Sequence, residues 1–232
     1  MKNQYFGDIN DYRKYGILRA LARSGLKTTV CWMLTKDDHH PDGRHIHYLH
    51  QPNKFRCFDP PLFDSLHSAV TKKRKRTVDW VDSQRLIPLA RYHTTLLTDG
   101  SDQWPAFFQE LSGIARKRDI IFFDPDNGLE VKSRPKGKKD SCKYIYWDEV
   151  KKFWSLGYSL LIYQHFPRVN RMEYIRLLSK EIRSRTGAAE IITFKTSTVA
   201  FFLLVQSKHR KKILTAADSI RSEWRGMIEV VG

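Results

Sequence analysis

Apolar and polar residues along this chain follow two periodicities, one typical of helices and one typical of strands. Apolar positions recur at helical spacing over residues 9–23, where Asp8 or Asn10 can cap the first turn and Gly25 can end the helix. Residues 27–35 are rich in residue types that favour strands. The chain is therefore predicted to open with a helix that leads into a strand.

The remaining segments continue this alternation. Strands are predicted at 94–98, 119–124, 159–163, 190–196 and 199–206, and helices at 103–116, 147–156, 170–185 and 208–225. Alternating strands and helices imply right-handed crossovers and a largely parallel sheet, whereas the last two strands indicate a hairpin. We expect an α/β fold with a doubly wound, mostly parallel, Rossmann-like sheet that ends in a C-terminal antiparallel hairpin. This order resembles the class I fold of methyltransferases that use S-adenosyl-L-methionine (AdoMet).

The length of 232 residues and a hydrophobic content of 41% favour one folded domain over residues 1–232. Residues 50–93 are mixed in pattern and predict a small helical insertion. No window approaches the ~20 apolar residues of a membrane span, and the N-terminus begins no apolar signal core. The three cysteines lie far apart without a C-x-x-C motif, which favours a reducing cytoplasm.

The most informative segment is the one that follows the central predicted strand. Four apolar residues at 120–123 lead directly into Asp124, Pro125, Asp126 and Asn127. Pro125 has no N–H and cannot extend a strand ladder, so the chain must leave the sheet there. Ligands of open α/β sheets bind outside the carboxyl ends of the strands, so these side chains are candidates for a site. The same residue types also suit a tight turn.

This cluster resembles motif IV of the amino-methyltransferases, D/N-P-P-Y/F. Asp124 and Pro125 match its first two positions, while Asp126 replaces the second proline and Asn127 the aromatic residue. In that family the acid or amide and a prolyl carbonyl accept hydrogen bonds from an exocyclic amine, and the aromatic residue stacks on the target base. The resemblance implies that these four residues are catalytic. A more literal match, Asp59-Pro60-Pro61, is predicted to be a helix start instead.

The N-terminal segment carries a second resemblance. Gly7, Asp11 and Lys14 match the opening G-N-x-x-D-x-x-K-H of the bacterial 23S ribosomal RNA adenine-N6 methyltransferase family, while Asp8 stands for asparagine and Tyr15 for histidine. The resemblance implies AdoMet as cofactor, with the lysine helping to hold its methionine end. The alternative for the acid and the lysine is an intrahelical i,i+3 pair on the surface.

Two further acids are candidates for cofactor contacts. Asp38 belongs to the loop 37–42, which holds three acids and two histidines after the first strand and suits cofactor hydroxyls, a divalent ion or a solvated turn. Asp99 follows the strand at 94–98, where the methyltransferase fold usually places an acid that contacts adenine. The glycine-bearing loop of the family has no counterpart here, since residues 35–44 contain only Gly43.

Charge indicates a polyanionic partner. Lys and Arg number 41 against 25 for Asp and Glu, a formal net charge of +16, and nucleic acid is the commonest partner of such a surplus. Basic runs at 72–76, 132–139 and 208–212 are expected to contact phosphates. The candidate nucleic-acid contacts near the site are Lys132, Arg134, Lys136, Lys138, Lys139, His165 and Arg168.

Three functions remain open from the sequence. The first is an AdoMet-dependent nucleic-acid methyltransferase that acts on an adenine amine in RNA or DNA. The second is a nuclease that uses Mg²⁺ or Mn²⁺ on Asp124, Asp126 and Glu130, with residues 130–132 in E-x-K form. The third is a non-catalytic nucleic-acid-binding module on a methyltransferase scaffold, indicated by the missing aromatic residue and glycine loop.

Overall fold

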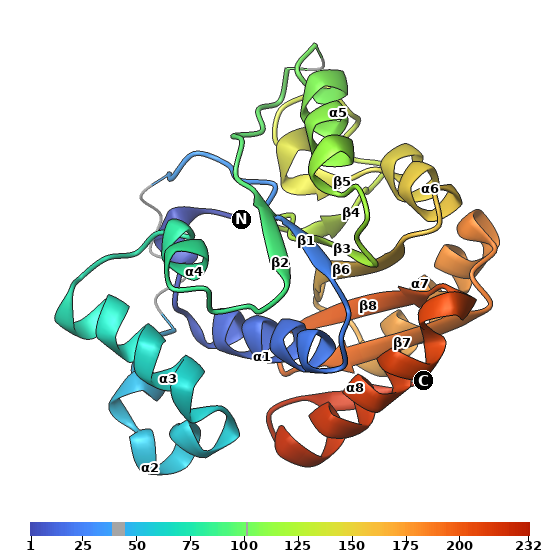
Figure 1. Ribbon diagram of the computed structural model, residues 1–232. Coiled ribbons are helices and arrows are strands. Elements are labelled where there is room, and N and C mark those ends of the chain that lie inside the picture. The colour runs from blue at the N-terminus through green and yellow to red at the C-terminus, as the bar shows by residue number, and fades with distance from the viewer. Residues whose placement is uncertain (39–44, 101) are drawn as a thin grey trace.

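A seven-stranded sheet forms the centre of the computed structural model, which describes residues 1–38, 45–100 and 102–232 (Figure 1). Its strands lie side by side in the order β2-β1-β3-β6-β8-β7-β9. Their bounds are β1 Thr28–Cys31, β2 Ala90–His93, β3 Ile120–Phe123, β6 Ser159–His165, β7 Glu190–Lys195, β8 Val199–Val205 and β9 Glu229–Val231. A separate two-stranded sheet pairs β4, Gly128–Leu129, with β5, Tyr144–Ile145.

The sheet is parallel through its first four strands and mixed beyond them. β1 pairs in parallel with β2 and β3, and β3 pairs in parallel with β6. β8 runs antiparallel to both of its neighbours, β6 and β7, and β9 runs antiparallel to β7. The structure therefore confirms a mostly parallel α/β sheet and the predicted hairpin, whose second strand lies inside the sheet.

Helices cover both faces of the sheet because successive strand residues point to opposite sides. Ile120 and Phe122 pack into one hydrophobic core, and Ile121 and Phe123 pack into the other. The first core includes α1 Ile9–Arg23, α3 Pro60–His67 and α8 Arg210–Glu223, and the second includes α5 Trp104–Ile114, α6 Trp147–Ser155 and α7 Arg171–Thr186 (Figure 1).

Two helix starts that the sequence indicates are confirmed by their caps. The Asp8 side chain accepts hydrogen bonds from the backbone N–H groups of Asn10 and Asp11 and so caps α1. The Asp59 side chain accepts a hydrogen bond from the Leu62 N–H, 3.1 Å away, at the start of α3. The Asp-Pro-Pro motif at 59–61 is thus a helix start.

The segment predicted as a helical insertion contains short helices. They are α2 Pro52–Phe55, α3, a π-helical turn Ser68–Lys72 and α4 Asp79–Ser83. Short 3₁₀ turns lie at Asn3–Tyr5, His47–His50, Arg56–Phe58, Ser141–Lys143 and Ser207–His209. None of the helices in the described part of the chain has the length and apolar character needed to cross a membrane.

The prediction of a strand at 94–98 is wrong. Strand β2 ends at His93, and Leu96 forms only an isolated bridge to Leu34. The reason is that β2 is an edge strand whose Arg91 is exposed, so it lacks the apolar run of a buried strand. Three strands of two or three residues, β4, β5 and β9, had no predicted counterpart.

Candidate active site

A cavity of about 530 Å³ lies beyond the carboxyl ends of β3 and β6. The loop after β3 contributes Asp126 and Asn127 to its wall, and the end of β6 contributes Tyr163 and His165. The N-terminal segment and the start of α1 close another side, where Tyr5, Asp8 and Asn10 line the cavity, together with Lys2, Asp38 and Lys143. This is the edge of the sheet at which the sequence predicts a site, and the volume suits a small-molecule ligand.

A buried ion-pair cluster lies beside the cavity and fixes the loop after β3 to α1. Lys14 Nζ lies 2.8 Å from Asp11 Oδ1 and 2.6 Å from Asp124 Oδ2, and all three side chains are buried. Asp11 Oδ2 also accepts hydrogen bonds from the Gly7 N–H and the Tyr15 hydroxyl. Burial lowers the pKa of Lys14, but the two carboxylates outweigh it and raise the net pKa above the ordinary lysine value.

The structure therefore brings together four residues that the sequence assigns to the site, Gly7, Asp11, Lys14 and Asp124. The alternative of a surface pair between Asp11 and Lys14 is wrong, since both side chains are 3% exposed. The buried ammonium needs two carboxylates, so the Asp124 side chain faces Lys14 and is not free to accept a hydrogen bond from a ligand. Pro125 is also buried. Of the motif residues, only Asp126 and Asn127 line the cavity.

Asp126 belongs to a polar cluster between the carboxyl ends of β1 and β3. Its Oδ1 lies 2.8 Å from the α-ammonium of Met1, and its Oδ2 accepts a hydrogen bond from the Thr35 hydroxyl at 3.0 Å. The same ammonium donates to the carbonyl oxygens of Met33 and Asp124. Burial raises the pKa of Asp126, but the ammonium and the hydroxyl outweigh it and hold the net pKa below the ordinary value. Asp126 is thus an ionised acid at the cavity wall.

Asn127 is held by its backbone while its side chain remains available. Its N–H donates to the Lys143 carbonyl and its carbonyl accepts from the His165 N–H, each at 3.0 Å. Its side-chain amide lines the cavity and makes no hydrogen bond with any residue in the described part of the chain. Tyr163 also lines the cavity, with its ring 5.6 Å from that of Phe201. An amide and an aromatic ring therefore face the same space.

Asp8 and Asp38 are the other acids of the cavity wall. Burial and the neighbouring charge of Asp11 raise the pKa of Asp8 to about 7. Asp38 forms an ion pair with Lys2 and accepts a hydrogen bond from the Gln4 side chain at 2.9 Å. The rest of the predicted acid and histidine loop, residues 39–42, lies outside the described residues.

Asp99 does not line this cavity. Its carboxylate accepts hydrogen bonds from the N–H groups of Asp140 and Cys142, at 2.8 and 2.9 Å, and from the Ser141 hydroxyl. Burial raises the pKa of Asp99, but these donors outweigh it and keep the net pKa below the ordinary value. The structure therefore gives Asp99 the role of holding the turn at 140–142 instead of the predicted cofactor contact.

The predicted nucleic-acid contacts fall into different environments. Lys136 forms ion pairs with Asp148 and Glu149 and lies 5.0 Å from the Trp104 ring centroid, so its charge is neutralised. His165 lines the cavity, and Arg168 lies in a neighbouring depression that His165 also lines. The other predicted contacts are exposed, namely Lys132, Arg134, Lys138 and Lys139.

The metal site of the nuclease alternative is not formed. Glu130 Oε2 accepts a hydrogen bond from the Trp147 N–H at the start of α6, 2.8 Å away, while Asp124 faces Lys14 and Asp126 faces Met1. Within residues 1–38, 45–100 and 102–232, no group of three or more His, Cys, Asp or Glu side chains is arranged to hold a metal ion. The three acids are close in sequence, but each has a different partner.

Several wall residues were not predicted. Tyr5, Lys143 and Thr198 come from separate segments, and no local motif marks them. Tyr163 had a usable signal, since it ends a predicted buried strand next to His165. No protein-family model matches this chain, and no curated protein matches it either.

Proposed function

We propose that the protein is an AdoMet-dependent methyltransferase of nucleic acid that acts on an adenine amine. The observation that carries this proposal is the cavity at the carboxyl ends of β3 and β6, in a sheet whose reversed strand β8 lies between β6 and β7. That strand order, with β1 between β2 and β3, resembles the sheet of class I methyltransferases. Fold alone does not fix function, so the proposal also requires that the wall residues suit the cofactor.

The wall offers groups that match the parts of AdoMet. The ionised Asp126 suits a positively charged group, and Lys2 and Lys143 suit a carboxylate. Each is ion-paired in the structure, Asp126 with Met1, Lys2 with Asp38 and Lys143 with Asp140, so AdoMet would replace these partners on binding. Asp8 and Asp38 are acceptors for ribose hydroxyls, and the rings of Tyr5 and Tyr163 are surfaces for a base. Bound in this cavity, AdoMet would supply an electrophilic methyl group.

The chain's own part in the reaction is to orient the target. The side-chain oxygen of Asn127 is free to accept a hydrogen bond from an exocyclic amine, which directs the lone pair of that amine. Tyr163 replaces the aromatic residue that the Asp124–Asn127 motif lacks, because it lines the same cavity as Asn127. The role that the motif resemblance implies for Asp124 thus passes to Asn127.

A transfer assay tests this function. The protein is incubated with AdoMet carrying a radiolabelled methyl group and with total RNA or DNA, and label in the nucleic acid is counted. Wild type is expected to transfer label, and Asn127→Ala to lose roughly 100-fold in rate, as is common when a positioning group is removed. Asn53→Ala, an exposed change on α2, is the matched control and should leave the rate unchanged. Failure of wild type to label either nucleic acid contradicts the proposal.

One observation favours a non-catalytic nucleic-acid-binding module as the second candidate. The Met1 ammonium occupies the space between the carboxyl ends of β1 and β3, bound to Met33, Asp124 and Asp126. A chain segment in that space competes with a ligand for the same acceptors. This candidate predicts salt-sensitive binding of nucleic acid and no heat on titration with AdoMet.

We place the activity in the cytoplasm. The cysteines, Cys31, Cys57 and Cys142, are free thiols in the structure. Unpaired, sparse cysteines are usual in a reducing compartment.

A further inference from the structure

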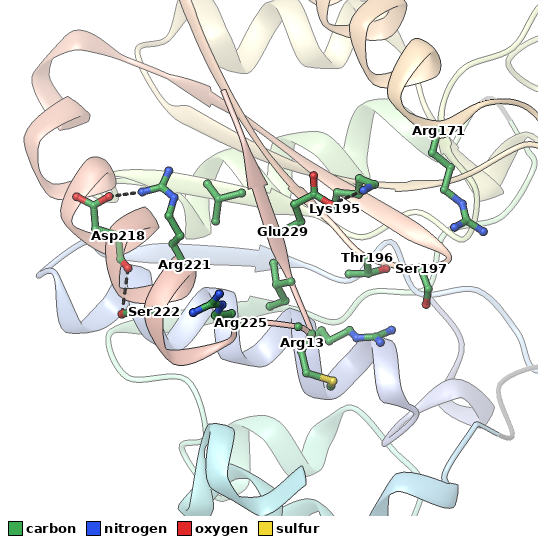
Figure 2. Close-up of a pocket in the computed structure, with 14 residues that line it drawn as sticks. Arg13, Arg171, Lys195, Thr196, Ser197, Asp218, Arg221, Ser222, Arg225 and Glu229 are labelled. Atoms are coloured by element: carbon green, nitrogen blue, oxygen red, sulfur yellow. Dashed lines mark hydrogen bonds and ion pairs between the residues drawn. The ribbon is translucent and has the colours of Figure 1, made fainter. Parts of the chain in front are cut away.

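A second cleft, of about 990 Å³, opens where α1, the start of α7, the β7–β8 turn and the segment from α8 to β9 meet (Figure 2). Its wall carries five cationic side chains from these separate elements. They are Arg13, Arg171, Lys195, Arg221 and Arg225. Figure 2 shows Arg171 and Arg13 on opposite sides of the Thr196–Ser197 turn.

Two of the five charges are neutralised within the cleft. Asp218 pairs with Arg221, and Glu229 pairs with Lys195. The remaining three, Arg13, Arg171 and Arg225, form no ion pair with any carboxylate in the described part of the chain. The cleft therefore has a net positive charge from groups that are free to bind an anion.

Arg13 shows a specific unsatisfied donor. Its Nη1 donates to Asn10 Oδ1 at 3.1 Å, but its Nε is buried and has no hydrogen-bond partner among the described residues. Burial lowers the pKa of Arg13, and the nearby Asp8 only partly opposes this. A buried donor without a partner destabilises the folded protein, and Arg13 lines the cleft in which an anion can bind.

The cleft and the candidate active site are linked by a depression that shares wall residues with both. It shares Arg171 and Ser197 with an adjacent depression of about 540 Å³, to which Arg168 contributes a further cation. That depression in turn shares His165 and Thr198 with the cavity at the carboxyl ends of β3 and β6. We call this row of adjoining depressions, from Arg225 to the cavity, the groove.

We propose that this groove binds the sugar-phosphate backbone of a single-stranded nucleic acid and leads one nucleotide into the cavity. Guanidinium groups bind phosphate oxygens through paired hydrogen bonds, and the hydroxyl of Ser197 is an additional donor at the wall. The delivery of a nucleotide rests on the proposed methyltransferase function, whereas the phosphate contacts do not. The groove, and not the predicted run at 132–139, is thus the main binding surface.

The test compares two pairs of charge removals by fluorescence anisotropy, without AdoMet. The probes are fluorescein-labelled single-stranded RNA and DNA of about 12 nucleotides, a length within the usual range of single-strand sites. Arg171→Ala with Arg225→Ala removes two exposed groove charges, and Lys138→Ala with Lys139→Ala removes two exposed charges from the predicted run. Circular dichroism confirms that both double variants remain folded.

The groove variant is expected to weaken binding of at least one probe by about tenfold or more and to lower the slope of log K against log salt by about 1.4. The Lys138/Lys139 variant should show a smaller loss of affinity and a smaller change in the salt slope than the groove variant. Equal losses in the two variants, or no loss in the groove variant, overturn the proposal. The binding assay contains no AdoMet, so its result does not depend on methyl transfer. Binding that depends on the groove, without methyl transfer in the transfer assay, contradicts only the proposed function. Methyl transfer without binding that depends on the groove contradicts only this inference.

Discussion

Lys14 is the residue on which the geometry of the candidate site most depends. It joins α1 to the loop after β3 through Asp11 and Asp124, the latter 110 positions away in the chain. Pairing of a buried cation with two buried anions is stable only as a set, because removing one member leaves an uncompensated charge. The cluster fixes the backbone that presents Asp126 and Asn127 to the cavity.

Replacing Lys14 by methionine keeps the bulk of the side chain and removes its charge. Asp11 and Asp124 then remain buried without a cation, so the free energy of unfolding should fall by about 3–5 kcal/mol. Urea denaturation measures this change. Lys143→Met is the control, since the Lys143–Asp140 pair is partly exposed and should contribute at most about 1 kcal/mol. Similar losses in the two variants would contradict the structural role of Lys14.

The raised pKa of Asp8 implies that the stability of the fold depends on pH. Its pKa rises from the ordinary 3.8 to about 7 in the folded protein, so the folded state holds a proton that the unfolded state has lost between these values. Asp8 therefore destabilises the fold progressively as the pH rises from about 4 to 7, by an upper bound of about 4 kcal/mol.

Asp8→Asn keeps a good N-cap and removes this titration. We expect the variant to gain stability over wild type as the pH increases from 5 to 8, measured by urea denaturation at several pH values. Asp82→Asn, an exposed change, should show no such trend. A difference between Asp8→Asn and wild type that is constant across this range would refute the assignment.

At the scale of elements, the buried strands and the helix caps could be predicted from the sequence, whereas the edge strand and the shortest strands could not. Residues 120–123 and the hairpin 190–206 are apolar enough to indicate strands directly. Strand β2 has mixed burial, and β4 and β5 have two residues each, so their pairing comes from tertiary contacts that no local pattern contains. The predicted strand at 94–98 failed for this reason.

The loop after β3 also depends on a glycine. Gly128 has a φ of +124°, and a Cβ there would lie 2.3 Å from the Gln164 side chain. That side chain holds the loop, because it accepts a hydrogen bond from the Leu129 N–H and donates to the Asn127 carbonyl. Gly128→Ala should therefore lower the free energy of unfolding by about 1–3 kcal/mol.

The control for this prediction is Gly113→Ala. Gly113 lies in α5, and a Cβ added there would have no neighbouring atom within 4 Å. Alanine at this position should therefore stabilise the protein by about 0.5–1 kcal/mol. Thermal unfolding of both variants gives the comparison. If the unfolding temperatures of both variants shifted in the same direction, the loop would not require glycine at position 128.

At the scale of the whole molecule, the edge of the sheet at which the polar residues lie was predictable, but the partner of each residue was not. The polar cluster after a buried strand correctly indicated the carboxyl edge of the sheet. The sequence could not show that Asp124 faces Lys14, that Asp99 holds a turn, or that Tyr163 and Asn127 line one cavity, because each depends on how distant segments pack together. The basic groove from Arg225 to the cavity is likewise assembled from separate elements.

Calorimetric titration with AdoMet tests the central claim, that the cavity at the carboxyl ends of β3 and β6 holds this cofactor. Wild type should release or absorb heat with a single binding site, and Thr198→Trp, which places a large side chain at the cavity wall, should abolish it. Circular dichroism shows whether the variant is folded. No heat from wild type at concentrations above about 100 μM, where a binding free energy near −5.5 kcal/mol would be visible, would contradict the account. Equal heat from wild type and the folded variant would contradict it as well.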